Sequence, residues 1–109
     1  MTFKEYQEKA IITQKPFPTL KDKVVNCLLG ISGETGEVME LFKKHWRDDK
    51  ELDMENLTKE VGDILWYMAV LTYELGINFD DVAERNIAKL KARHGDKFSG
   101  VGDRSGAGK

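Results

Sequence analysis

The sequence has almost no cysteine and no long hydrophobic run. Its one cysteine is Cys27, so the chain cannot close an internal disulfide, and a reducing compartment such as the cytoplasm is expected. The neighbours of Cys27 are mostly apolar, which favours a buried thiol over a nucleophile. The longest apolar run, residues 64–71, is far too short to cross a bilayer, and the N-terminus is too polar for a signal peptide. We therefore expect a cytoplasmic protein that does not enter a membrane.

An excess of charge of one sign is also missing. Seventeen basic and 19 acidic side chains give a formal net charge of −2, so nothing indicates a nucleic-acid partner. Charged residues make up 33% of the chain and hydrophobic residues 40%, which is typical of a folded globular protein. A length of 109 residues suits one domain with a modest core, which favours association between copies of the chain.

The two prolines, Pro16 and Pro18, separate a short amphipathic helix from a longer helical part. Apolar residues at helical spacing predict three helices after the prolines. These span residues 20–44, then from Asp53 or Asn56 as the cap to Gly76, and from Asn78 to Gly95. No strand pattern emerges, so the predicted fold class is all-α, a helical bundle of about four helices. We expect one domain over residues 1–98 and a disordered, glycine-rich tail over 99–109.

The predicted helix that ends at Gly76 is apolar on more than one side. One stripe of apolar residues follows a 4-3-4-3-4 spacing, and Trp66, Tyr67, Val70 and Tyr73 lie off that stripe. A helix with apolar residues on several sides is buried on several sides. The pattern therefore predicts a subunit interface, and with it a homodimer or a homotetramer.

Two pairs of carboxylates give the strongest chemical signal. Glu34 and Glu37 form one pair, and Glu60 and Asp63 form the other. Residues three apart leave the same side of a helix, and each pair borders an apolar stripe. Two antiparallel helices packed along these stripes would place four carboxylates in a partly dry site, where they raise each other's pKa unless a cation neutralises them. Oxygen ligands select Mg²⁺ or Mn²⁺ over zinc.

Two other interpretations compete with a metal site at these carboxylates. A single E-x-x-E on a helix is most often a solvated surface. Here, however, both pairs stand beside helical glycines, Gly33, Gly36 and Gly62, and each glycine costs about 1 kcal/mol relative to alanine. A ferritin-like di-iron site needs Glu-x-x-His, and neither His45 nor His94 follows a glutamate at that spacing.

Basic and amide side chains form a stripe late in the chain. Asn86, Lys89 and Arg93 are spaced three and four residues apart, so they share one side of a helix. Ordinary solvated surface is the common explanation of such a stripe. The functional interpretation is a phosphate clamp, because ammonium and guanidinium groups form charge-assisted hydrogen bonds with phosphate oxygens.

At these residues the sequence resembles the MazG-like branch of the all-α nucleoside triphosphate pyrophosphohydrolases, over about residues 28–98. The motifs E-x-x-E, E-x-x-D and K-L-x-x-R stand at residues 34–37, 60–63 and 89–93. The resemblance implies Mg²⁺-dependent cleavage of a (d)NTP between its α- and β-phosphates into (d)NMP and pyrophosphate. It also implies a dimer or a dimer of dimers with sites formed at the interface.

The predicted roles follow from the residues and this resemblance together. Glu34, Glu37, Glu60 and Asp63 are the expected metal ligands. Glu37 and Glu34 are the catalytic candidates, with Glu37 favoured by its position for orienting or deprotonating water. Asn86, Lys89 and Arg93 are expected to hold the leaving pyrophosphate. Trp46 and Trp66 are candidates for stacking on a base.

Several alternatives stay open at the level of sequence. Phosphoribosyl-ATP pyrophosphatase and dUTP or dCTP pyrophosphatase are sibling activities on the same scaffold. A non-catalytic helical oligomerisation or metal-binding module is the other class. The preferred base and sugar are not encoded in any pattern that we recognise.

Overall fold

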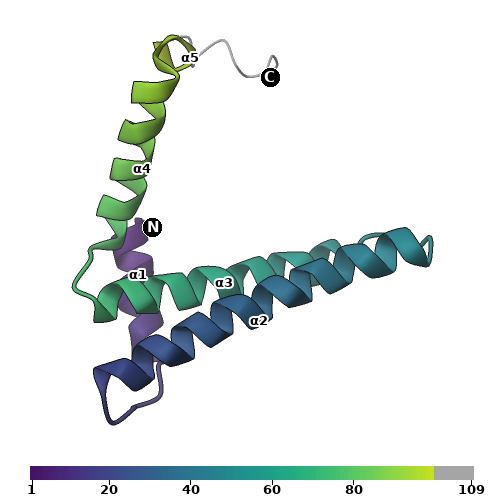
Figure 1. Cartoon of the computed structure of the whole chain (residues 1–109), viewed down its shortest axis with the longest axis horizontal. Coiled ribbons are helices and arrows are strands. Elements are labelled where there is room, and N and C mark those ends of the chain that lie inside the picture. The colour runs from purple at the N-terminus through teal and green to yellow at the C-terminus, as the bar shows by residue number, and fades with distance from the viewer. Residues whose placement is uncertain (100–109) are drawn as a thin grey trace.

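In the computed structural model, residues 1–99 are described, and this part of the chain contains helices and no strand (Figure 1). The helices are α1 (Phe3–Ile12), α2 (Leu20–Arg47), α3 (Met54–Glu74), α4 (Phe79–Arg93) and α5 (Gly95–Ser99). The all-α class is confirmed. The predicted tail lies outside the described residues except for Ser99, which ends α5.

Local capping determines where the helices begin. Asp53, one of the two predicted caps, accepts a hydrogen bond from the Asn56 backbone N–H at 3.0 Å. Asn78 caps α4 by accepting from the Asp80 N–H at 2.8 Å. Such caps satisfy N–H groups that have no partner inside the helix. Because capping depends on neighbours in the sequence, these starts were predictable from the sequence.

A glycine ends α3 close to the predicted position. Gly76 has φ = 77°, the left-handed conformation that glycine adopts without steric cost. The Ile77 N–H donates to the Thr72 carbonyl at 2.8 Å and the Gly76 N–H to the Tyr73 carbonyl at 3.0 Å, which is the hydrogen-bond pattern of a Schellman motif. The chain turns sharply here before α4 begins.

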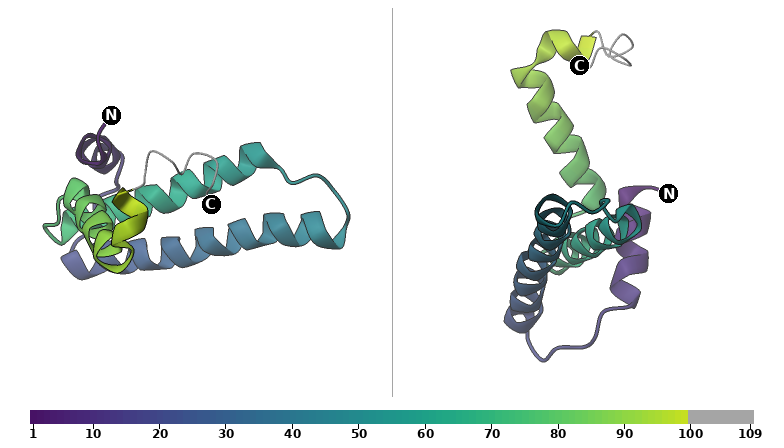
Figure 2. Two further views of the ribbon diagram at one scale, coloured as in Figure 1. Left: turned by 90° about the horizontal axis from the view of Figure 1, so that it is seen from above. Right: turned by 90° about the vertical axis from the view of Figure 1, so that its right-hand side faces the viewer.

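The long helices α2 and α3 lie side by side as an antiparallel hairpin (Figures 1 and 2). At Gly30 of α2 the Tyr67 ring of α3 takes up the space of a side chain, because an added Cβ atom would come within 2.2 Å of that ring. At Gly33, Gly36 and Gly62, by contrast, an added Cβ would meet no atom within 4 Å. Within one chain, the glycines beside the carboxylates are therefore not needed for packing.

The fully buried core lies at one end of the hairpin, where α1 packs across α3 and also touches the start of α4. Its members are Ala10, Cys27, Ala69, Val70 and Phe79. The buried thiol expected for Cys27 is confirmed, since its exposure is 0%. Burial, and then the charge of Glu74, raises the pKa of this thiol.

The fourth helix extends away from the hairpin (Figure 1). Its apolar residues Val82 and Ile87 are 40% and 45% exposed. The radius of gyration is 17.3 Å, whereas a compact domain of this length has about 13 Å. Val82 and Ile87 therefore keep a large part of their apolar surface uncovered in a single chain. None of the described helices is both long and apolar enough to span a membrane.

Candidate functional site

Three of the four predicted ligand carboxylates meet between α2 and α3. Glu34 comes from the middle of α2, and Glu60 and Asp63 come from the first half of α3. One oxygen of each lies within 4.8 Å of an oxygen of the other two. The antiparallel packing of the two apolar stripes produces this arrangement, as the sequence predicted. Glu34 and Glu60 are partly buried, and Asp63 is exposed.

The cluster holds more negative charge than the protein around it neutralises. The pKa of Glu34 is raised from 4.5 to about 7, first because its protonated form shares a hydrogen bond with Glu60, and then because of burial and the charges of Asp63, Glu60 and Glu37. The Glu34 Oε2 atom is buried, and no donor among the described residues reaches it. Either a proton or a cation can supply the missing positive charge.

The donor set fits a hard divalent cation. All three groups offer carboxylate oxygens, and the buried Oε2 of Glu34 has no hydrogen-bond partner among the described residues. Mg²⁺ and Mn²⁺ prefer such oxygen ligands, whereas zinc sites use nitrogen and sulfur as well. These residues therefore fit Mg²⁺ or Mn²⁺.

Glu37 stands apart from the three-carboxylate cluster. It follows Glu34 by three residues on α2 and is exposed, and it does not belong to the group of mutually close oxygens. It is still near enough that its charge contributes to the raised pKa of Glu34. Glu37 is thus a solvent-exposed neighbour of the cluster, about one helical turn from Glu34 on α2.

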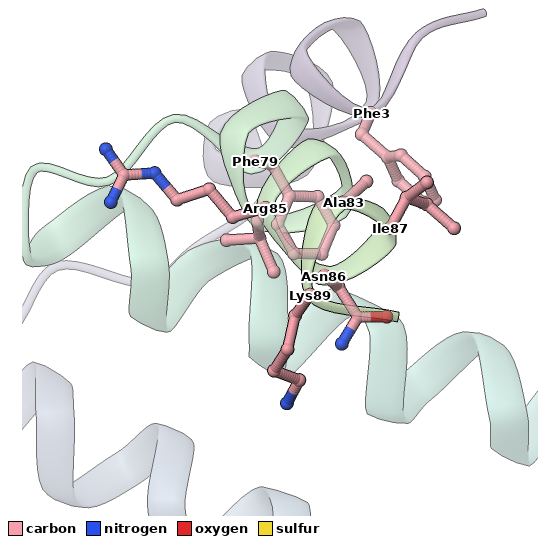
Figure 3. Close-up of a pocket in the computed structure, with 8 residues that line it drawn as sticks. Phe3, Phe79, Ala83, Arg85, Asn86, Ile87 and Lys89 are labelled. Atoms are coloured by element: carbon pink, nitrogen blue, oxygen red, sulfur yellow. The ribbon is translucent and has the colours of Figure 1, made fainter. Parts of the chain in front are cut away.

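The predicted basic stripe is not brought to the carboxylates within this chain. Asn86 and Lys89 instead border an apolar groove of about 630 Å³ on α4, whose walls include Phe3, Phe79 and Ile87 (Figure 3). Asn86 and Lys89 point to the same side of α4, and Arg85 points to another (Figure 3). Arg93 is exposed at the far end of the helix.

No pattern in the sequence predicted that α1 lies close to Asp63. Tyr6 packs against the core, and its pKa is raised first by burial and then by the charge of Asp63. Nothing in the local sequence of α1 relates these two residues, because their proximity results from the packing of α1 across α3. The one available signal was Gln7, a polar residue on the same side of the predicted helix as the apolar Phe3 and Ala10. A polar residue at such a position needs hydrogen-bond partners from another part of the chain.

A small cavity of about 220 Å³ lies one helical turn beyond Asp63, between α3, α2 and the segment after α1. Trp66 and Tyr67 form one wall, with their rings edge to face at 5.0 Å. The Trp66 Nε1–H donates to the Thr13 hydroxyl at 2.9 Å. Gln14 also lines the cavity, and its Nε2 atom is buried without a hydrogen-bond partner among the described residues.

The second tryptophan is in a different place. Trp46, near the end of α2, is 73% exposed. Its ring lies 5.3 Å from that of Phe42, centroid to centroid, beside a shallow apolar groove of about 810 Å³. That groove contains none of the three clustered carboxylates. Of the two stacking candidates, Trp66 is therefore the one near the acidic cluster.

Comparison with known proteins places most of this architecture in a described family. A family model for the MazG nucleotide pyrophosphohydrolase domain matches residues 23–98, which leaves α1 outside the match. The chain is also similar to the "Gene 37 protein" of Mycobacterium phage L5, with 39% identity over 69 residues. That alignment covers 60% of this chain, and the chain spans about 60% of the length of that relative. No solved structure matches.

Proposed function

We propose, since the chain belongs to the MazG nucleotide pyrophosphohydrolase domain family, that it hydrolyses (d)NTP to (d)NMP and pyrophosphate with Mg²⁺. The observation that carries this proposal is the cluster of Glu34, Glu60 and Asp63 with its buried, unpartnered oxygen. These residues would hold the cation, with Glu37 as a fourth ligand. A bound Mg²⁺ or Mn²⁺ would neutralise the carboxylates and polarise the α-phosphoryl group as a Lewis acid.

The side chains of the chain itself then divide the remaining tasks. Glu37, the solvent-exposed neighbour of the cluster, orients the attacking water and accepts its proton. Glu34 supports the same step from the partly buried side. Asn86, Lys89 and Arg93 bind the leaving pyrophosphate, whose negative charge grows as the bond breaks.

This division of labour needs a second copy of the chain. The basic stripe lies on α4, which extends away from the carboxylates of its own chain (Figure 1). The apolar groove on α4 and the exposed Val82 and Ile87 provide a surface for association. We therefore propose a homodimer or homotetramer in which α4 of one copy serves the carboxylates of another. The cytoplasmic location and the single domain over residues 1–98 remain part of this proposal.

The cavity beside Tyr67 is proposed to receive part of the nucleoside. It lies one turn from Asp63 and combines an aromatic wall with polar groups such as Gln14 and Asn26. A base can stack on an aromatic face while its edge forms hydrogen bonds. Trp66 contributes to this wall, although its Nε1–H is already engaged by Thr13.

The deciding experiment is a panel of (d)NTPs incubated with the protein and Mg²⁺, with pyrophosphate and monophosphate measured as products. We expect pyrophosphate release that is lost in Glu60→Gln. Glu55→Gln is the matched control, because Glu55 lies on the same helix, is exposed, and pairs only with Lys59. Release of inorganic phosphate and a diphosphate, or equal rates in both variants, would contradict the proposal.

The shared site has its own test by complementation. Glu60→Gln damages the carboxylate half, and Arg93→Ala damages the phosphate half. Mixed and reassembled, the two impaired variants should regain activity above that of either variant alone, because mixed oligomers contain one site with both halves intact. Light scattering should show a dimer or tetramer. An active monomer would refute the shared site without touching the proposed reaction.

The alternatives lead to distinct outcomes in the same panel. Preferential cleavage of phosphoribosyl-ATP, dUTP or dCTP would assign one of the sibling activities. Binding of Mn²⁺ that depends on Asp63, with no turnover of any nucleotide, would favour the non-catalytic metal-binding module.

A further inference from the structure

The turn between α3 and α4 has little support from these two helices themselves. They touch only near the turn, and the left-handed Gly76 lies in it. Arg93 stands about 21 Å from the start of α4, at 1.5 Å per residue. A swing of about 20° at the turn would therefore displace Arg93 by about 7 Å. Something outside α3 and α4 has to hold this angle.

One side chain of α1 bridges the two sides of the turn. The Gln7 amide nitrogen lies 3.2 Å from the Ala69 carbonyl and 3.0 Å from the Thr72 hydroxyl, both on α3, and donates to the Ile77 carbonyl at 3.0 Å. Its Oε1 atom accepts from the Phe79 N–H, the first residue of α4, at 3.2 Å. Gln7 thus binds the end of α3, the turn and the beginning of α4 at once.

The chemistry of this position requires an amide. The Phe79 N–H is among the first N–H groups of α4, which have no partner inside the helix, and the Ile77 carbonyl needs a donor. A neutral amide presents two N–H donors and a carbonyl acceptor at the end of one side chain, which is what these partners need. Gln7 is 4% exposed, and it is the one buried polar side chain among the residues whose burial is described. Losing its bonds would leave buried backbone groups unpaired.

Two weaker contacts between α1 and α4 support the same angle from the exposed side. The Lys4 N–H donates to Asp80 Oδ1 at 2.9 Å. The rings of Phe3 and Phe79 pack edge to face at 5.4 Å. The first helix therefore contacts the beginning of α4 through several groups, and Gln7 makes the buried part of these contacts.

From this geometry we infer that Gln7 is a positioning residue: it sets the angle at which α4 leaves α3 and thereby places Lys89 and Arg93 for binding pyrophosphate. The inference rests on the proposed function for what the two basic residues bind. It concerns α1, which lies outside residues 23–98 that match the family. The hydrogen bonds of Gln7 go to the end of α3, the turn and the start of α4, and none goes to Glu34, Glu60 or Asp63, so we expect its effect to reach the reaction through α4.

The principal test is Gln7→Met, which keeps the length of the side chain and removes every hydrogen bond. Ile11→Ala is the matched control. Ile11 packs against the same core from α1, but no hydrogen bond joins it to the turn between α3 and α4. Both variants weaken the packing of α1, and only the first releases α4. Thr72→Val is a milder variant, in which Gln7 loses one acceptor, for the case that Gln7→Met does not fold.

Three readouts separate positioning from general destabilisation. In Gln7→Met, Mn²⁺ binding should stay at the wild-type level, whereas the affinity for inorganic pyrophosphate should fall about tenfold or more, the size of one lost charge-assisted contact. KM for the nucleotide should rise by a similar factor and more than kcat falls. Ile11→Ala should show none of these changes, and Thr72→Val should show them in smaller degree.

A structural readout keeps the inference testable even if no nucleotide is hydrolysed. Spin labels at the exposed positions Lys59 on α3 and Ala92 on α4, in a Cys27→Ala background diluted with unlabelled protein, report the angle between the two helices. We expect a broader or shifted distance distribution in Gln7→Met alone. An unchanged distribution, or wild-type pyrophosphate affinity and KM, would overturn the inference. Absent turnover in the wild type would refute the proposed function and leave the label distances to decide this point.

Discussion

Glu34→Gln is expected to make the cation-free protein more stable above neutral pH, although it removes a proposed ligand. The raised pKa of Glu34, about 7 instead of 4.5, means that its charged form is disfavoured in the folded state. Glutamine carries no charge and can still donate to Glu60 as protonated Glu34 does. The substitution therefore removes a repulsion that the wild type retains at high pH.

The sign and size follow from proton linkage. Between pH 4.5 and 7 the folded wild type binds more protons than the unfolded chain, so its free energy of unfolding falls as the pH rises through this range. At about 1.4 kcal/mol per pH unit the upper bound is about 3 kcal/mol. Solvent screening at a partly exposed site reduces the expectation to about 1–2 kcal/mol. Below pH 4.5 the two proteins should be equally stable.

Urea unfolding at fixed protein concentration, with a chelator, measures this difference at pH 4.5 and pH 8. Saturating Mn²⁺ should reverse the order at pH 8, because a ligand at a hundredfold excess over its Kd stabilises the folded wild type by about 2.7 kcal/mol, and the variant binds it more weakly. Identical dependence of stability on pH in the wild type and Glu34→Gln would refute the reasoning, since Glu34 would then not be the group that titrates.

Three further predictions follow from the same structure. Asp63→Asn should weaken Mn²⁺ binding greatly in calorimetric titration, and an unchanged affinity would remove Asp63 from the ligand set. Arg93→Ala should leave metal binding intact and lower kcat/KM about ten- to a hundredfold, as expected for a contact worth about 1.5–3 kcal/mol. Arg93→Lys should recover part of this loss. Wild-type steady-state kinetics in Arg93→Ala would show that Arg93 does not contact the substrate. Gly30→Ala should destabilise the protein by about 1–3 kcal/mol through its clash with the Tyr67 ring. Gly33→Ala should be neutral or stabilising by up to about 1 kcal/mol. Thermal melts in which both variants lose equal stability would contradict this contrast.

The parts of the site that depend on local rules were predictable from the sequence. The caps Asp53 and Asn78 act on backbone groups two or three residues away. Helical spacing relative to an apolar stripe was enough to bring Glu34 into contact range of Glu60 and Asp63 once two helices packed antiparallel. For such features the pattern of side chains and the geometry of a helix determine the outcome.

The direction of α4 was not predictable in this way. It depends on hydrogen bonds from Gln7 to residues more than 60 positions away along the chain. No periodicity encodes such contacts, because they form only after α1 has packed across α3. For the same reason the sequence did not reveal that Tyr6 lies near Asp63, or that Lys89 and Arg93 lie on a helix extending away from the acidic cluster.

The uneven placement of the buried core has a consequence for proteolysis. Cys27, Ala69 and Val70 anchor one end of the α2–α3 hairpin, while its opposite end, around residues 47–54, contains no fully buried side chain. Segments with few buried contacts open with the smallest free energy, so we expect a protease to cut near this end. The carboxylate cluster lies between the two ends and draws on both helices. A cation bound there would hold α2 and α3 together. The rate of proteolysis at the connection around residues 47–54 would therefore fall when the site is filled.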